Sequence, residues 1–275
     1  MRADSIEIEA RGLGKSFGDH AVLADVNLAV ARGELVAIVG GSGSGKTVLM
    51  HLLAGLIEPS VGRVFAADHS REGSPLTDLS MLDGDGLDVL RRHWSMVFQK
   101  NALFSGSVRE NCSLILREHG GLTEEEIDAR VRDGLRAVAL DPESVLDKDR
   151  DELSGGMAKR VAIARAVAID PALIFFDEPT TGLDPIIGAQ IHDLIWATHR
   201  RPRRVPGGSE RRTTIIVTHD RELLRRLAPR VIMLENSGGA GRVCEDVPYG
   251  QFGSRGGPAA EYLRQMPALH GRDAT

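Results

Sequence analysis

A glycine-rich segment near the start of the chain has the composition of a triphosphate site. Residues 40–47 read GGSGSGKT, which satisfies the pattern G-x-x-x-x-G-K-[ST]. Glycines let successive backbone N–H groups turn toward an anion, and a following helix offers its positive N-terminal end. Lys46 is predicted to reach the β- and γ-phosphates, and the Thr47 hydroxyl to bind Mg²⁺. An apolar strand before the segment and a helix after it disfavour a plain glycine turn.

A pair of acids at the end of an apolar strand is the second chemical feature. Residues 173–178 read LIFFDE, so that Asp177 and Glu178 follow the strand directly. Such a strand places its last residues at the carboxyl edge of a parallel sheet, where open α/β folds bind ligands. Asp177 fits the role of holding Mg²⁺ through water, and Glu178 fits a general base that polarises the attacking water. Two acids can also simply begin a loop, but the phosphate loop favours catalysis.

Two further polar residues close short strands. His219 ends TIIVTH, and Gln99 ends SMVFQ at residues 95–99. His219 could hydrogen-bond a γ-phosphate and its attacking water, whereas the Gln99 amide could contact Mg²⁺ or that water. A lone histidine is usually structural, so the prediction depends on the shared position of both residues at strand ends.

The segment LSGGM at residues 153–157 contains no obvious acid, base or nucleophile. Ser154 is predicted to cap the helix that contains MAKRVAIARAVA. Gly155 and Gly156 leave backbone N–H groups approachable at a positive helix N-terminus, which suits a phosphate group. A plain serine cap followed by flexible glycines explains SGG taken alone.

Strands and one helix must position the phosphate loop. The first part of the chain alternates apolar and polar residues and predicts short antiparallel strands. LVAIVG is apolar on both faces, as a buried parallel strand would be. Leucines spaced as on one face of a helix follow the loop, namely Leu49, Leu52, Leu53 and Leu56.

The rest of the chain alternates strands and helices around a helical block. Residues 105–170 predict a separate helical lobe, with a capping box at Thr123 and Glu126. After this block come LIFFD, a helix from about Pro185, TIIVTH, a short helix and VIMLE. This alternation predicts a parallel sheet.

The connecting segments are less informative. Residues 66–88 are loop-like and acidic. Within them, DGDGLD at 83–88 does not fit a calcium loop, because Leu87 and Trp94 stand at positions that need ligands. We therefore predict a solvated turn there. RRPRRVPGGSERR at 200–212 predicts a basic surface loop that could alternatively meet anionic headgroups or a partner. No regular element is predicted after about residue 240.

Composition restricts the class of protein. The chain has 275 residues and a net charge of −5, which gives no global basic field for nucleic acid. Cys112 and Cys244 are far apart, fit no metal spacing and are expected to be reduced. No stretch reaches the ~20 apolar residues of a membrane-spanning helix, and MRADSIEIEARG lacks the apolar core of a signal peptide. We therefore expect a cytosolic chain whose membrane role is peripheral.

The ordered motifs resemble the nucleotide-binding subunit of ABC transporters. The phosphate loop, Gln99, LSGGM, LIFFDE, GLDP and His219 occur in the order of that family, over roughly residues 5–240. The resemblance implies a P-loop NTPase fold of the α/β class, with a mostly parallel sheet core, an N-terminal antiparallel β region and a helical lobe. It places the ATPase domain at 5–243, the lobe at about 100–170 and a C-terminal tail at 244–275.

The same resemblance implies a site shared by two copies of the chain. In the family, the Ser-Gly-Gly segment caps the γ-phosphate of the ATP held by the opposite subunit. The implied catalytic residues are Glu178, His219 and Lys46, and the implied Mg²⁺ ligands are Thr47, Gln99 and Asp177. Phe17 would stack on adenine, and Asp184, in Leu183-Asp184-Pro185, would link the two sites. The implied ATP contacts are Phe17, Gly40, Gly41, Ser42, Gly43, Ser44, Gly45, Lys46, Thr47, Val48, Gln99, Ser154, Gly155, Gly156 and Asp184.

Finer motifs resemble the ATPases of Mla/Mce lipid-transport systems. Met157 replaces the usual glutamine of the signature, and VFQKNALF, GKTVLM and DEPTTGLDPI accompany it. The resemblance implies an integral membrane permease, Mce-domain and STAS-like accessory subunits, and a place on the cytoplasmic face of the inner membrane. The alternatives are the ATPase of an amino-acid or other small-solute importer, a non-transport ABC ATPase, and a P-loop kinase. DNA-repair members of the family carry a long coiled coil, for which this chain has no room. Translation factors carry two nucleotide motifs, and this chain has one. A P-loop kinase would not need the LSGGM segment.

Overall fold

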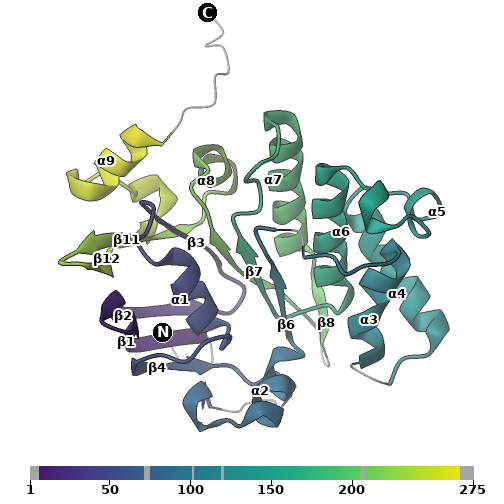
Figure 1. Ribbon diagram of the computed structural model, residues 1–275, viewed down its shortest axis with the longest axis horizontal. Coiled ribbons are helices and arrows are strands. Elements are labelled where there is room, and N and C mark those ends of the chain that lie inside the picture. Colours follow the sequence, from purple (N-terminus) through teal and green to yellow (C-terminus); the bar gives the residue numbers. More distant parts are fainter. Residues whose placement is uncertain (1–5, 71–74, 101, 119–120, 206–207, 267–275) are drawn as a thin grey trace, which may run out of the picture. The chain divides into compact units, whose positions relative to one another are not determined.

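A computed structural model describes residues 6–70, 75–100, 102–118, 121–205 and 208–266. The chain divides into two compact units (Figure 1). The first unit comprises Met1–Asp83 and Ile215–Thr275, and the second comprises Gly84–Thr214. The predicted start of the ATPase domain at residue 5 and the last part of the predicted tail, 267–275, lie outside the described residues.

A mixed sheet runs through the first unit, with strand order β5-β4-β1-β2-β12-β11-β3-β10. Strand β10 begins at the last two residues of the second unit and continues into the first. The bounds are β1 Ile6–Phe17, β2 His20–Ala31, β3 Leu35–Gly40, β4 Val61–Ala66, β5 Thr77–Asp78, β10 Thr213–Val217, β11 Arg230–Ser237 and β12 Ala240–Pro248. β1 pairs antiparallel with β2 and β4, whereas β3 is parallel to β11. Every residue of β3 is buried, as its apolar sequence predicts.

Helix α1 (Lys46–Leu53) follows the phosphate loop and buries Leu49, Leu52 and Leu53. The prediction that Leu56 continues this face was wrong, because Leu56 is 45% exposed beyond the end of the helix. Gly55 explains the difference: its φ of 64° takes the backbone out of the helical region, and the Leu56 N–H instead bonds to His51 O.

The segment after residue 240 is more regular than its sequence predicts. β12 pairs antiparallel with β11, and a 3₁₀ turn (Tyr249–Gln251) and helix α9 (Gly257–Gln265) follow it. Phe252, Ala259 and Met266 are buried. Pairing with β11 and these apolar contacts stabilise elements that the local sequence pattern does not predict. The other helix of this unit, α8 (Arg221–Leu227), is the predicted short helix.

Two parallel strands and a group of helices form the second unit. Strand β6 (Trp94–Val97) pairs in parallel with β7 (Leu173–Asp177). The helices are α2 Gly84–Arg91, α3 Val108–Glu118, α4 Glu124–Ala137, α5 Pro142–Val145, α6 Gly155–Ala168 and α7 Pro185–Arg200, with 3₁₀ turns at Leu79–Met81, in the first unit, and Arg150–Glu152. The capping box of Thr123 and Glu126 is confirmed. The solvated turn predicted at 83–88 was wrong, because α2 begins at Gly84 and buries Leu90.

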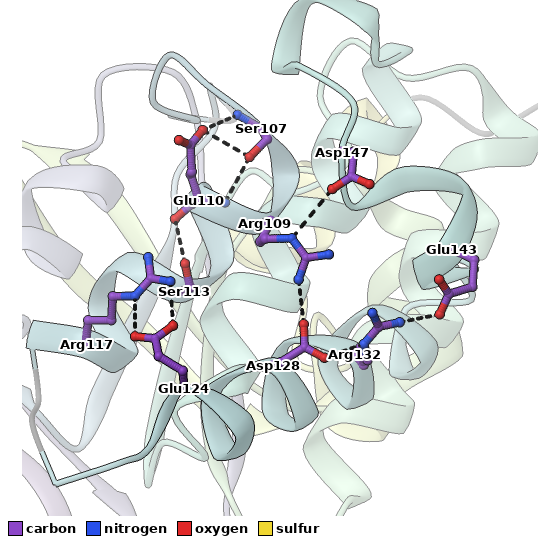
Figure 2. Close-up of polar contacts among 10 residues, drawn as sticks. All are labelled: Ser107, Arg109, Glu110, Ser113, Arg117, Glu124, Asp128, Arg132, Glu143 and Asp147. Carbon is purple, nitrogen blue, oxygen red and sulfur yellow. Dashed lines mark hydrogen bonds and ion pairs between the residues drawn. The ribbon is translucent and has the colours of Figure 1, made fainter.

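Ion pairs join α3, α4 and α5 (Figure 2). Arg109 of α3 contacts Asp128 of α4, and Arg132 contacts both Asp128 and Glu143 of α5. Such solvent-accessible pairs contribute little to stability, so apolar packing carries most of it. A Cβ atom at Gly134 would lie 3.0 Å from Ala164 O, so this glycine lets α4 approach α6 closely.

The basic segment 200–212 is not simply a solvated loop. It contains the β8–β9 hairpin (Arg203–Val205 and Gly208–Glu210), and both Arg203 and Arg212 are buried. The Arg212 guanidinium donates to Thr198 O at 2.7 Å, to Pro171 O at 2.9 Å and to the Asp170 carboxylate at 2.6 Å. Burial lowers the pKa of Arg212 to about 10, so the group stays charged at neutral pH.

Candidate nucleotide site

Backbone geometry shapes the phosphate loop in the first unit. Gly40 ends β3 with a φ of 148°, and a Cβ atom there would lie 2.3 Å from Leu234 O. Gly45 precedes α1 with a φ of 90°, and a Cβ atom there would lie 2.6 Å from the Leu23 side chain. Both positions therefore need glycine for conformation and for space. The loop consequently turns tightly between β3 and α1 with its backbone held against β11 and β2.

The side chains of the loop fit a triphosphate. The Ser44 hydroxyl is buried and has no hydrogen-bond partner among the described residues. A buried hydroxyl without a partner is unfavourable, and a phosphate oxygen would supply the missing bond. Lys46 Nζ lies over the loop, donating to Gly40 O and to Gly41 O, each at 2.9 Å. The ammonium group is thus already held at the mouth of the loop.

Two other predicted residues lie in the same unit. Thr218 N donates to Ile38 O at 3.2 Å, so the strand that His219 follows is adjacent to β3. The His219 side chain is exposed. Phe17 ends β1 with 52% of its surface exposed, and Lys15 Nζ lies 4.9 Å from the centre of its ring. An exposed aromatic ring of this kind offers a face for a base.

The second unit brings Asp177, Glu178 and Gln99 to one edge. Because β6 and β7 are parallel and Val97 pairs with Phe176, the residues that follow both strands share their carboxyl edge. Asp177 is buried, whereas Glu178 is half-buried and accepts a hydrogen bond from the Thr181 hydroxyl at 3.4 Å. Glu178 has a φ of 44°, an uncommon value outside glycine that often marks functional positions.

Helix α6 begins with the predicted cap. The Ser154 hydroxyl accepts a bond from Met157 N at 3.3 Å, which confirms Ser154 as the N-cap. Gly155 faces open space, but a Cβ atom on Gly156 would lie 2.9 Å from Ile187 of α7. The two glycines therefore differ: Gly155 leaves room for a ligand, and Gly156 allows close helix packing. Asp184 caps α7 by accepting bonds from Ile186 N and Ile187 N, both at 3.0 Å.

Sequence reasoning missed a buried lysine at this edge. Lys159 of α6 is 2% exposed, and its Nζ donates to Phe98 O at 3.1 Å and to Gln99 O at 2.9 Å. Burial lowers the pKa of Lys159 to about 8, and the negative charge of Asp177 opposes that shift. A lysine directly after an alanine in a helix pattern gives no sequence signal that its side chain is buried. Gly241 was missed for a similar reason, although a Cβ atom there would lie 2.1 Å from Ser44 O.

The predicted residues thus fall into two sets. The first unit holds Phe17, Gly40, Gly41, Ser42, Gly43, Ser44, Gly45, Lys46, Thr47, Val48 and His219, and the second holds Gln99, Ser154, Gly155, Gly156, Asp177, Glu178 and Asp184. Their individual roles remain predictions. Hydroxyl, amide and carboxylate oxygens from Thr47, Gln99 and Asp177 are the hard donors that suit Mg²⁺. None of the helices among the described residues has the length and hydrophobicity needed to cross a membrane.

Comparison with known proteins identifies the family. The ABC transporter family model matches residues 23–181. The chain is 35% identical over 236 residues to the chloroplastic protein TRIGALACTOSYLDIACYLGLYCEROL 3 of Arabidopsis thaliana, covering 82% of this chain and 65% of that one. It is 37% identical to the intermembrane phospholipid transport system ATP-binding protein MlaF of Haemophilus influenzae, covering 80% and 77%. A probable anion import ATP-binding protein of Haloferax volcanii is 38% identical, covering 85% and 78%.

A solved structure agrees with this match. The dimeric post-hydrolysis state of the ATP-binding cassette MJ0796, bound to ADP and Pi, superposes with a TM-score of 0.73 and 30% identity, covering 88% of this chain and 98% of that one. The fold predicted from the motifs, an α/β P-loop cassette, is confirmed. The chain therefore belongs to the ABC transporter family, and it is an ATP-hydrolysing subunit with the P-loop fold of that family.

Proposed function

We propose that this ABC ATPase drives the transport of phospholipids or related lipids across or between envelope membranes, in a system of the Mla/Mce type. The LSGGM signature with Met157 carries the proposal, supported by similarity to a relative named for intermembrane phospholipid transport. The alternative is the import of a small solute, because ATP-binding proteins named for anion and methionine import match at 38% and 36% identity.

The proposed reaction gives each predicted residue a role toward ATP. Ser44 and Lys46 hold the phosphates, and Phe17 supports the adenine. Glu178 accepts the proton of the attacking water, and His219 holds that water and the γ-phosphate. Mg²⁺, when held by Thr47, Gln99 and Asp177, would neutralise charge on the β- and γ-phosphates.

A second copy of the chain completes this site. Ser154 and Gly155 form an accessible helix N-terminus, which suits the γ-phosphate of an ATP bound by the partner. A two-fold axis makes the contact reciprocal, so two such sites form at once. The dimeric state of the MJ0796 cassette supports this arrangement.

An apolar hollow in the second unit suits a permease. It has a volume of about 260 Å³ and is lined in part by Trp94, Phe98, Phe104, Leu114 and Arg165. Phe104 is 56% exposed, and the neighbouring Phe98 and Leu114 are also exposed, which is a large apolar area for a free surface. We propose that an amphipathic helix on the cytoplasmic side of the permease docks here and places the chain at the inner membrane as a peripheral subunit.

Substituting Phe104 with Asp tests this docking surface. The charge would enter the apolar hollow, and we expect the F104D variant to lose at least about tenfold of the permease that co-purifies with the tagged full chain. Its ATP binding should stay unchanged. The matched control is Val89→Asp, at an exposed apolar residue of α2 that does not line the hollow. Equal loss of the permease in both variants would contradict the assignment.

Transport by the purified complex tests the substrate class. The intact complex, reconstituted into liposomes containing a fluorescent phospholipid, should move that lipid to acceptor membranes only with ATP and Mg²⁺. A complex built with Lys46→Ala provides the control, because it should move none. Uptake of methionine or an inorganic anion in place of lipid transfer would support the small-solute alternative and reject the lipid proposal.

A further inference from the structure

Lys159 connects two parts of the second unit that the proposed function uses. It lies in α6, the helix that begins at the Ser154 cap, and its ammonium group donates to the backbone carbonyls of Phe98 and Gln99. A buried ammonium group is unfavourable unless hydrogen bonds and a nearby negative charge compensate it. Lys159 therefore holds the start of the Gln99 segment against the signature helix.

A second cation of α6 holds the other end of the same segment. Arg165 donates to Ala102 O at 3.0 Å, and its guanidinium lies 5.3 Å from the centre of the Phe104 ring. Arg150 donates to Leu103 O at 3.0 Å. Residues 98–99 and Ala102 are thus held on α6 by Lys159 and Arg165. The hydrogen bonds from these charged side chains to backbone carbonyls are stronger than bonds between neutral groups.

We propose that Lys159 is a positioning residue: it fixes the Gln99 segment to α6, so that Gln99 and the Ser154 cap move as one body. The inference deepens the proposed function, on which it depends. Pressure by a permease on Phe98 and Phe104 would then reach Ser154, and with it the γ-phosphate held by the partner. Lys159 itself touches neither the nucleotide nor the water.

The test separates this role from simple support of the fold. Lys159→Met keeps the length of the side chain but removes all three donors, whereas Lys159→Arg keeps donors for both carbonyls. Arg160→Met is the matched control, because Arg160 is the next residue of α6 and donates to Val138 O and Gln190 Oε1, outside the Gln99 segment. Each substitution is made in the full chain.

We expect Lys159→Met to lower kcat for ATP hydrolysis about tenfold or more, because a small misplacement of a catalytic constellation has effects of that size, while KM for ATP stays within about threefold. Lys159→Arg should restore kcat to within about threefold of the parent. Arg160→Met should leave both parameters close to those of the parent. A Lys159→Met protein with the parent's kcat, or a loss that Arg160→Met reproduces, would overturn the proposal.

Hydrogen exchange gives a readout that a purely structural residue would not move. In the hydrolysis-arrested Glu178→Gln chain, ATP and Mg²⁺ should protect the amides of 98–104 and 154–158 together. Adding Lys159→Met should abolish the protection of 98–104 and leave that of 154–158, and Lys159→Gln repeats the measurement if the Met variant does not fold. Protection of both segments in the absence of Lys159 overturns the inference alone. Absence of nucleotide-dependent protection in the parent overturns the proposed shared site, and the inference with it.

Discussion

The Glu178→Gln protein is expected to bind ATP and to hydrolyse it about 10³-fold more slowly than the parent, because glutamine cannot accept a proton from the attacking water. A loss of that size corresponds to about 4 kcal/mol of transition-state stabilisation. Glu178 stands directly after β7 with a positive φ and a bond from Thr181, so the carboxylate is held in place rather than free on a loop. The amide keeps this shape and removes only the base.

A second consequence follows from the same substitution. If ATP joins two copies, a chain that binds ATP without consuming it should accumulate as a dimer. Phosphate release measures turnover, and light scattering during size-exclusion chromatography measures mass with and without ATP and Mg²⁺. Glu125→Gln serves as the control, since Glu125 is exposed on α4 and should change neither quantity. A Glu178→Gln chain that remains monomeric in saturating ATP would be incompatible with a site shared by two copies.

Local sequence rules predict those parts of the fold in which one segment carries its own signal. LVAIVG is apolar on both faces and forms the buried strand β3. Helix α6 begins after the predicted N-cap Ser154, and α7 begins at Pro185 as predicted. The phosphate loop is of the same kind, because glycine spacing and conformation are properties of a few adjacent residues.

Features that depend on distant residues were predicted poorly. β12 becomes a strand because it pairs with β11, and its own sequence carries little alternation. Lys159 can be buried because two carbonyls of a segment some sixty residues earlier accept hydrogen bonds from its ammonium group. Gly241 must be glycine because the backbone of Ser44 lies against it. In each case the signal lies in tertiary contact, which overrides local propensity.

The same distinction applies to the site itself. Sequence motifs identify which residues bear chemistry, but the backbone decides which of them share an edge, as the register between β6 and β7 does for Gln99 and Asp177. The structure also distinguishes two glycines that look equivalent in LSGGM, because Gly156 packs against Ile187 and Gly155 does not. A substitution at Gly155 therefore reports on ligand contact, whereas one at Gly156 disturbs helix packing as well.

Reciprocity between two copies gives the second large effect. Lys46→Ala should abolish hydrolysis because the phosphate loop loses its cation, and Ser154→Arg should abolish it because a long side chain blocks the γ-phosphate of the partner's ATP. In a mixed dimer of these two variants, one site combines both defects and the other combines an intact phosphate loop with an intact serine. Mixing two inactive proteins should therefore restore activity.

The expected recovery follows from symmetry. Random pairing of equal amounts makes half of the dimers mixed, each with one intact site, so hydrolysis should return to about a quarter of the parent rate if the sites act independently. The control replaces Ser154→Arg with the double variant Lys46→Ala/Ser154→Arg, whose mixture with Lys46→Ala contains no intact site and should stay inactive. If the first mixture is as inactive as the control, the serine does not act on the partner's nucleotide. If Ser154→Arg alone hydrolyses ATP at the parent rate, α6 contributes nothing to the γ-phosphate in either copy.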